Sequence, residues 1–133
     1  MSDPQDRKST PGLAQASRVK AINRTRQAEL GHCIEVADRG PARTKGLLGR
    51  KQLDPGSGMW IVPCESVHTF FMQFAIDLVY LDRQNRIRKI RHAVPPWRVS
   101  ACLSAHSVIE LPAGTVMRTQ SEKGDVVEFI GGG

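Results

Sequence analysis

Short apolar runs separated by turn residues cover most of the chain. Pro, Gly, Asn and Asp interrupt the apolar pattern at short intervals, and this spacing is typical of β proteins rather than of helical ones. The predicted strands are His32–Ala37, Met59–Val62, His68–Phe74, Leu78–Leu81, Ile87–Val94, Val108–Leu111 and Val126–Ile130. Seven short strands predict a mainly β domain, built as a compact antiparallel sandwich or barrel.

The run Leu78–Leu81 is apolar at every position, which predicts a strand buried on both faces. It continues through the turn residues Asp82–Asn85 into the basic run Ile87–Val94. These two runs form the clearest hairpin prediction in the chain. One short helix is predicted at Arg39–Lys51, because Pro41 stands near its start and Leu47 and Leu48 supply an apolar side.

The two ends of the chain are poor in apolar residues. Residues 1–29 are rich in Ser, Gln, Arg, Thr and Pro, so burial of apolar surface offsets little of the entropy that ordering would cost. We therefore predict a flexible basic N-terminal arm over 1–29, a single β-rich domain over 30–130 and a flexible tail over 131–133.

Charge and cysteine content narrow the cellular setting and the class of partner. The 133 residues include 19 Lys and Arg against 13 Asp and Glu, a net charge of +6, which favours anionic partners without distinguishing their kind. The odd number of cysteines, 3, with no CxxC pair, predicts thiols in a reducing compartment. No run resembles a signal peptide or a membrane span. We expect a cytoplasmic protein with no membrane partner and no cofactor.

Several motifs together resemble a known family. They are Arg43–Arg50, Gly58–Met59, Thr69–Met72, Ile76–Asp82, Glu110–Gly114 and Gly124–Asp125, in this order between about Cys33 and Phe129. This set resembles the bacterial and archaeal family known as domain of unknown function 192. The resemblance implies a small jelly-roll-like β fold, and it implies no activity, substrate or catalytic residue. The commoner family pattern has Trp-Met-Lys-Asn-Thr where this chain has Phe71–Ala75, so ligand binding through that Lys-Asn pair is not expected here.

Glu110 and His68 are the most informative polar residues in the predicted strands. Glu110 stands between Ile109 and Leu111, so a buried strand would carry an ionisable carboxyl that requires a partner such as Arg98, His68 or a row of backbone amides. His68 begins an apolar strand, and it could act as an acid or base if Glu65, Asp77 or Glu110 lay within hydrogen-bonding reach. A purely structural role for each residue stays open.

Other motifs favour structure over chemistry. Glycines in Gly46–Arg50 fall too late in the predicted helix for a phosphate loop, which leaves Arg43 and Arg50 as candidate anion contacts. The four histidines and three cysteines lack the local spacing of zinc sites, so no metal is predicted. Cys64 and Cys102 lack any sequence signature of a catalytic cysteine.

The segment 83–98 is basic and contains no acidic residue. A basic strand followed by Trp97 could bind single-stranded nucleic acid, although one aromatic residue is few for that purpose. The alternative is a solvated strand whose charges prevent aggregation at a sheet edge.

Three hypotheses follow from these residues. The first is a non-catalytic binding or accessory domain for an anionic small molecule, peptide or protein partner, and its site residues are His68, Trp97, Arg98, Glu110, Asp77 and Arg50. The second is a small hydrolase-like enzyme in which His68 is oriented by Glu110 or Asp77. The third is a polyanion binder that uses the basic strand, for which a nucleic acid is the partner.

Overall fold

The computed structural model describes residues 17–40, 42 and 46–131, and most of the regular structure within them is strand. The elements are β1 (Arg18–Asn23), β2 (Ala28–Ala37), β3 (Ser57–Ile61), β4 (Ser66–His68), β5 (Ile76–Leu81), β6 (Ile87–Val94), β7 (Val99–Ala101), β8 (Ser107–Pro112), α3 (Thr115–Thr119) and β9 (Val127–Gly131). The expected mainly β architecture is confirmed, and the ends of β6 are those predicted.

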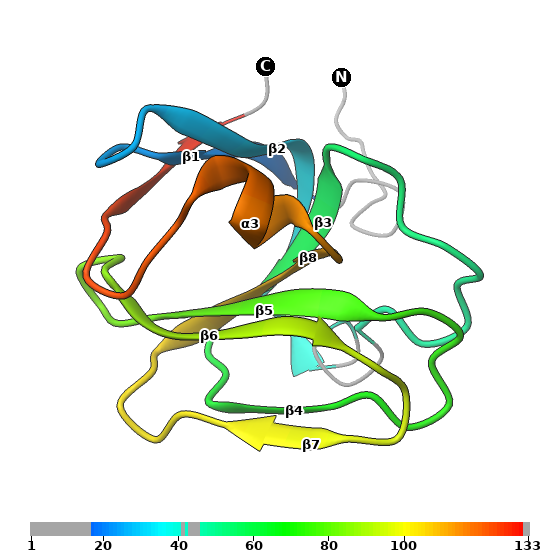
Figure 1. The fold of residues 1–133 in the computed structure, drawn as a ribbon. Helices are drawn as coiled ribbons and strands as arrows, with labels where there is room; N and C mark the ends of the chain where they lie inside the picture. The colour runs from blue at the N-terminus through cyan, green and yellow to red at the C-terminus, as the bar shows by residue number, and fades with distance from the viewer. Residues whose placement is uncertain (1–16, 41, 43–45, 132–133) are drawn as a thin grey trace, which may run out of the picture.

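Seven strands form one sheet in the order β6-β5-β8-β3-β2-β1-β9, and β4 and β7 form a separate pair. The large sheet curls, so that its two outer strands approach each other, and an isolated bridge joins Arg86 to Val126. Figure 1 shows α3 on one side of the curled sheet and the β4–β7 pair on the other. The sheet is antiparallel except for β2 and β3, which run parallel. The connection through 38–56 is long enough to return the chain to the starting end of β2.

Each face of the large sheet carries one apolar cluster, and the central strands are buried between them. Strand β5 alternates between them, because Leu78 and Tyr80 belong to the cluster under β4–β7, whereas Val79 and Leu81 belong to the cluster that includes Val116 of α3. All six residues of β5 are buried. The predicted burial of this strand on both faces and its hairpin with β6 are therefore confirmed.

The predicted N-terminal arm extends too far along the chain. Residues 18–29 of the predicted arm form β1, a turn and the start of β2, and β1 pairs with both β2 and β9. Asn23 is fully buried and donates hydrogen bonds to Ser121 Oγ and Asp125 Oδ2. Polar residues whose hydrogen bonds are all made inside the protein can form part of the interior, and a count of apolar residues along the sequence does not detect them. Residues 1–16 and 132–133 lie outside the described part of the chain.

The predicted strand His68–Phe74 is wrong beyond its first residue. Strand β4 ends at His68, and the chain turns through residues 69–72, where Phe71 has a φ of 66°. The expected alternation, with His68, Phe70, Met72 and Phe74 on one face, therefore does not form. Thr69 is the physical cause, because its buried side chain and backbone bond to the 95–98 loop instead of to a neighbouring strand.

The predicted helix Arg39–Lys51 does not extend to its predicted end, and residues 41 and 43–45 of this segment lie outside the described part of the chain. Gly40 and Ala42 are helical, and residues 46–49 form a turn. The described helix, α3, follows Gly114, whose φ of 98° favours glycine. Helix α3 and strand β7 are too short to produce a periodic apolar pattern.

Candidate functional site

A pocket of about 80 Å³ opens between β4, β8 and the turn at residues 46–48. Most of its wall is apolar, and its polar groups come from β4, the residues before it, and β8. The lining residues are Gly46, Leu47, Leu48, Ile61, Cys64, Ser66, Val67, His68, Met72 and Glu110. Two of the predicted site residues, His68 and Glu110, are therefore brought to one pocket from positions 42 residues apart in the numbering.

Glu110 supplies the buried charge of this pocket. Ile109 and Leu111 face the cluster beside α3, so the alternation of β8 directs Glu110 to the opposite face, where the pocket lies. Glu110 is only 4% exposed. Its Oε1 has no hydrogen-bond partner among the described residues. A methyl group added at Gly46 would lie 3.7 Å from this oxygen, so the turn passes directly over the carboxyl.

Burial in this setting raises the pKa of Glu110 from 4.5 to about 7, although the charge of Arg50 acts to lower it. Water stabilises an ionised carboxylate, and the apolar pocket wall removes most of that water. Near neutral pH the carboxyl is thus close to equally divided between its neutral and ionised forms. The neutral carboxyl can donate a hydrogen bond, and the ionised carboxylate can accept one from a cationic donor.

Arg50 and His68 are not hydrogen-bonded to Glu110 in the described structure. The guanidinium of Arg50 forms an ion pair with Glu35, with nitrogen–oxygen distances of 2.9 and 3.0 Å. His68 is exposed at the pocket rim, where its Nδ1 accepts a hydrogen bond from the backbone N–H of Phe70 at 3.3 Å. The acid–base pair expected for a hydrolase-like site, hydrogen-bonded between His68 and Glu110, is absent from these contacts.

Asp77 lies outside the pocket and has a structural role. It is fully buried, and its Oδ1 accepts a hydrogen bond from the N–H of Ala93. Its Oδ2 accepts from the N–H groups of Gly114 and Val116 at 3.1 and 2.9 Å. Asp77 thus joins β5 to the end of β6 and to the start of α3. Because three backbone groups occupy its oxygens, it does not orient His68.

Trp97 and Arg98 lie beside the pocket, next to two phenylalanines that sequence reasoning did not connect with them. We call Phe70, Phe71 and Trp97 the aromatic platform. The ring of Trp97 lies 5.6 Å from that of Phe70 and 4.7 Å from that of Phe71. Phe70 in turn lies 5.0 Å from the ring of His68, which connects the platform to the pocket rim. Only the adjacency of Phe70 and Phe71 in the sequence could have suggested this cluster.

Among the residues that the structure describes, no group of three or more His, Cys, Asp or Glu is arranged to hold a metal ion. In the same part of the chain, no helix has the length and apolar content that crossing a membrane requires.

Comparison with known proteins adds relatives of unassigned function. A UPF0127 protein of Pyrococcus abyssi is 31% identical over 116 residues, which cover 82% of this chain and 96% of the relative. A UPF0127 protein of Thermococcus kodakarensis is 28% identical over 114 residues, which cover 81% of this chain and 71% of the relative.

Two crystal structures share the fold. A protein of Sinorhizobium meliloti, described as a proposed transcription regulator, has a TM-score of 0.73 and 26% identity, and the match covers 85% of this chain and 92% of that one. A protein of unknown function from Novosphingobium aromaticivorans has a TM-score of 0.69 and 20% identity, with 84% and 83% covered. The second likeness concerns the fold alone. The model of the family DUF192, described as "Uncharacterized ACR", matches residues 21–129. The chain therefore belongs to the domain of unknown function 192 family.

Proposed function

We propose that this protein is a binding module whose pocket receives the cationic, hydrogen-bond-donating head group of a small ligand or of a partner side chain. The observation that carries the proposal is the Oε1 of Glu110 in the wall of that pocket, which has no hydrogen-bond partner among the described residues. Buried polar atoms without a hydrogen-bond partner are rare, because each costs about 1–3 kcal/mol. A ligand that donates a hydrogen bond to this oxygen would remove that cost.

The size and walls of the pocket limit the group that fits. A volume of about 80 Å³ exceeds two water molecules at roughly 30 Å³ each, and it accommodates a head group of a few heavy atoms. The side chains of Leu47, Leu48 and Met72 favour an alkyl portion next to that head. An alkylammonium group combines both properties. An anionic ligand, which the net charge led us to expect, would instead face the carboxylate of Glu110.

Proton release distinguishes this proposal from simple apolar binding. A cation pairs with the ionised form of Glu110, so binding must displace the proton that burial keeps on the carboxyl. With a pKa of about 7, the affinity for a cation should be about tenfold lower at pH 6 than at pH 8. A neutral alcohol of the same length should show no such rise with pH.

The experiment is a titration of the isotope-labelled protein with n-propylammonium chloride, followed by amide chemical shifts at Gly46, Leu48 and Val67. We expect saturable shifts with a dissociation constant in the range of about 1–10 mM, as suits so small a ligand. Sodium propionate and propanol serve as the anionic and neutral counterparts. Glu110→Gln should weaken propylammonium binding about tenfold. Glu128→Gln changes an exposed glutamate that pairs with Arg24, and it should leave the binding unchanged.

Stronger binding of propionate than of propylammonium would overturn the proposal, and so would an equal response of the Glu110→Gln variant. Absence of shifts at these amides at every pH would also exclude it.

We propose a reducing, cytoplasmic setting for this binding, which the odd number of cysteines supports.

A further inference from the structure

Large exposed apolar side chains gather beside the β4–β7 pair. Phe71, Trp97 and Val99 are 70%, 56% and 63% exposed. Single exposed apolar residues are common, but a group of them marks an interaction surface. Trp97 contacts Phe71 directly, and Val99 begins β7 two residues after Trp97. This group is independent of Glu110, which lies inside the neighbouring pocket.

The aromatic platform is held in a fixed and strained conformation. Phe71 and Trp97 have φ values of 66° and 68°, in the left-handed region that bulky side chains rarely adopt. Thr69 holds both loops in place. Its carbonyl accepts hydrogen bonds from the N–H groups of Met72 and Trp97, and its Oγ1 donates to the Pro95 carbonyl at 2.7 Å. Strain of this kind persists where the surrounding structure enforces it, and it often marks a functional surface.

Cations border this apolar group along β6 and the start of β7. We call Arg88, Lys89, Arg91 and Arg98 the basic rim. Lys89 Nζ donates to the Ala101 carbonyl, and Arg88 Nε donates to Ser104 Oγ, so both side chains reach across to the segment of β7. Arg91 interacts electrostatically with Tyr80 of β5, and the hydroxyl of Tyr80 donates a hydrogen bond to Ser100 of β7.

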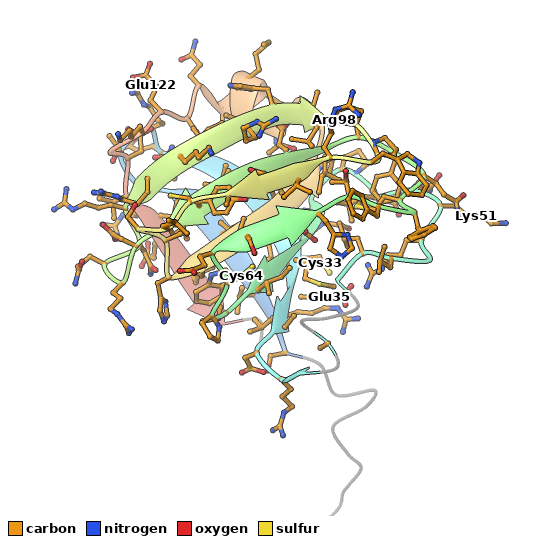
Figure 2. All side chains as sticks on the ribbon, turned by 90° about the horizontal axis from the view of Figure 1, so that it is seen from below. Cys33, Glu35, Lys51, Cys64, Arg98 and Glu122 are labelled. Atoms are coloured by element: carbon orange, nitrogen blue, oxygen red, sulfur yellow. The ribbon has the colours of Figure 1, made fainter. Side chains whose placement is uncertain are left out.

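No acidic side chain neutralises the basic rim in the ion pairs between described residues. Those ion pairs involve Arg24, Arg26 and Arg50, and residues 83–109 contain no Asp or Glu. Glu122, the partner of Arg26, lies well away from Arg98 in Figure 2. The acids nearest in the sequence are Asp82, whose Oδ1 accepts backbone N–H groups of the following turn, the buried Asp77, and Glu110 inside the pocket. Glu65, before β4, is exposed.

We infer that the aromatic platform and the basic rim bind an acidic segment of a partner protein, with an apolar side chain of that segment packed on Phe71 and Trp97. Carboxylates flanking the apolar side chain would pair with the rim, which supplies the charge complementarity. A second copy of this chain would instead bring like charges together. The rings of Trp97 and Phe71 pack edge to face on each other, and Val99 offers no flat face, so the surface suits a peptide better than stacked bases.

The test uses fluorescence anisotropy with a labelled twelve-residue peptide of Asp and Glu that carries one Phe and one Leu. We expect the peptide to bind with a Kd of about 10–100 μM at low salt and more weakly as salt screens the charges. Phe71→Ala and Trp97→Ala should each weaken binding about tenfold, as should the double change of Arg88 and Arg91 to Gln.

Matched controls lie on other surfaces. Met117 is 73% exposed on α3, so Met117→Ala tests an equally exposed apolar side chain, and Arg24→Gln tests an exposed cation. Neither should change binding. Near-ultraviolet circular dichroism of each variant confirms that it is folded. Glu110→Gln should also bind normally, so failure of this inference is distinguishable from failure of the proposed pocket function.

Three outcomes would overturn the inference. One is equal binding of a peptide in which Gly replaces the Phe and Leu, which would show attraction by charge alone. Another is tighter binding of a twelve-nucleotide thymidine oligomer or of vesicles containing phosphatidylserine, which would assign the surface to nucleic acid or to lipid. The third is absence of peptide binding at low salt.

Discussion

Replacing Glu110 with Gln should change how the stability of the protein depends on pH. The raised pKa means that the folded state binds the carboxyl proton more tightly than the unfolded state does. The folded protein therefore carries more protons between pH 4.5 and about 7, and its stability falls as the pH rises through that interval. The stabilisation is complete below 4.5 and is lost above about 7. Gln has no such proton, so this contribution disappears in the variant.

The expected magnitude follows from the two pKa values. The interval from 4.5 to about 7 corresponds to about 3.5 kcal/mol at roughly 1.4 kcal/mol per pH unit. Between pH 5 and pH 8 the original protein loses about 2–3 kcal/mol of this stabilisation. The free energy of unfolding of the variant, relative to the original protein, should rise by this amount over that range. Any fixed cost of burying the amide is the same at both pH values and cancels.

The measurement is urea unfolding of both proteins at several pH values between 5 and 8, with the midpoint and slope fitted at each. Glu128→Gln is the matched control, because Glu128 is 41% exposed and pairs with Arg24 at the surface. Its stability difference should stay within about 0.5–1 kcal/mol across the range. A difference for Glu110→Gln that did not change with pH would refute the argument that this carboxyl is desolvated.

Two further predictions concern residues that hold loops in place. Asp77→Asn places an amide group against backbone N–H donors, so it should lower the free energy of unfolding, measured with urea, by about 3–5 kcal/mol. A loss below about 1 kcal/mol would contradict the anchoring role of Asp77. Thr69→Val keeps the shape but removes the hydroxyl, so it should cost about 2 kcal/mol. Amide hydrogen exchange should then accelerate at Arg98 but not at Cys102, whose N–H donates to Glu65 at the other end of β7, and equal acceleration at both would point to general unfolding.

Local sequence patterns predicted the strands whose burial and turns are encoded in neighbouring residues. The hairpin of β5 and β6 is such a case, because an apolar run and a turn suffice to specify it. Strand β1 could not be found in this way, since its buried Asn23 is satisfied by Asp125, 102 residues away. The predicted strand that begins at His68 is too long for a similar reason, because Thr69 bonds to the distant 95–98 loop.

The candidate site was predictable in its chemistry and not in its geometry. The position of Glu110 between two apolar residues correctly indicated a buried carboxyl. Its surroundings depend on the turn of Gly46 and on β4, which no local pattern brings together. Asp77 looked equally suitable as a catalytic partner, yet its oxygens are occupied by backbone groups from β6 and α3. The aromatic platform could not be predicted, because Phe70 and Phe71 lie far from Trp97 in the sequence and contact it only in the folded chain.

The pairing of β1 with β9 has a consequence for how the chain folds. The hairpin of β5 and β6 joins neighbouring segments, whereas β1 pairs with the last strand, β9. Arg24, which follows β1, contacts Glu128 of β9 across a span of 104 residues. Closing a long span of chain costs conformational entropy before the strand contacts form. Strand pairings of this kind therefore form late and slow folding. Until β9 docks, the edge of β1 has unpaired backbone groups that can join another chain. The period before this final pairing is therefore when the protein is most prone to aggregate.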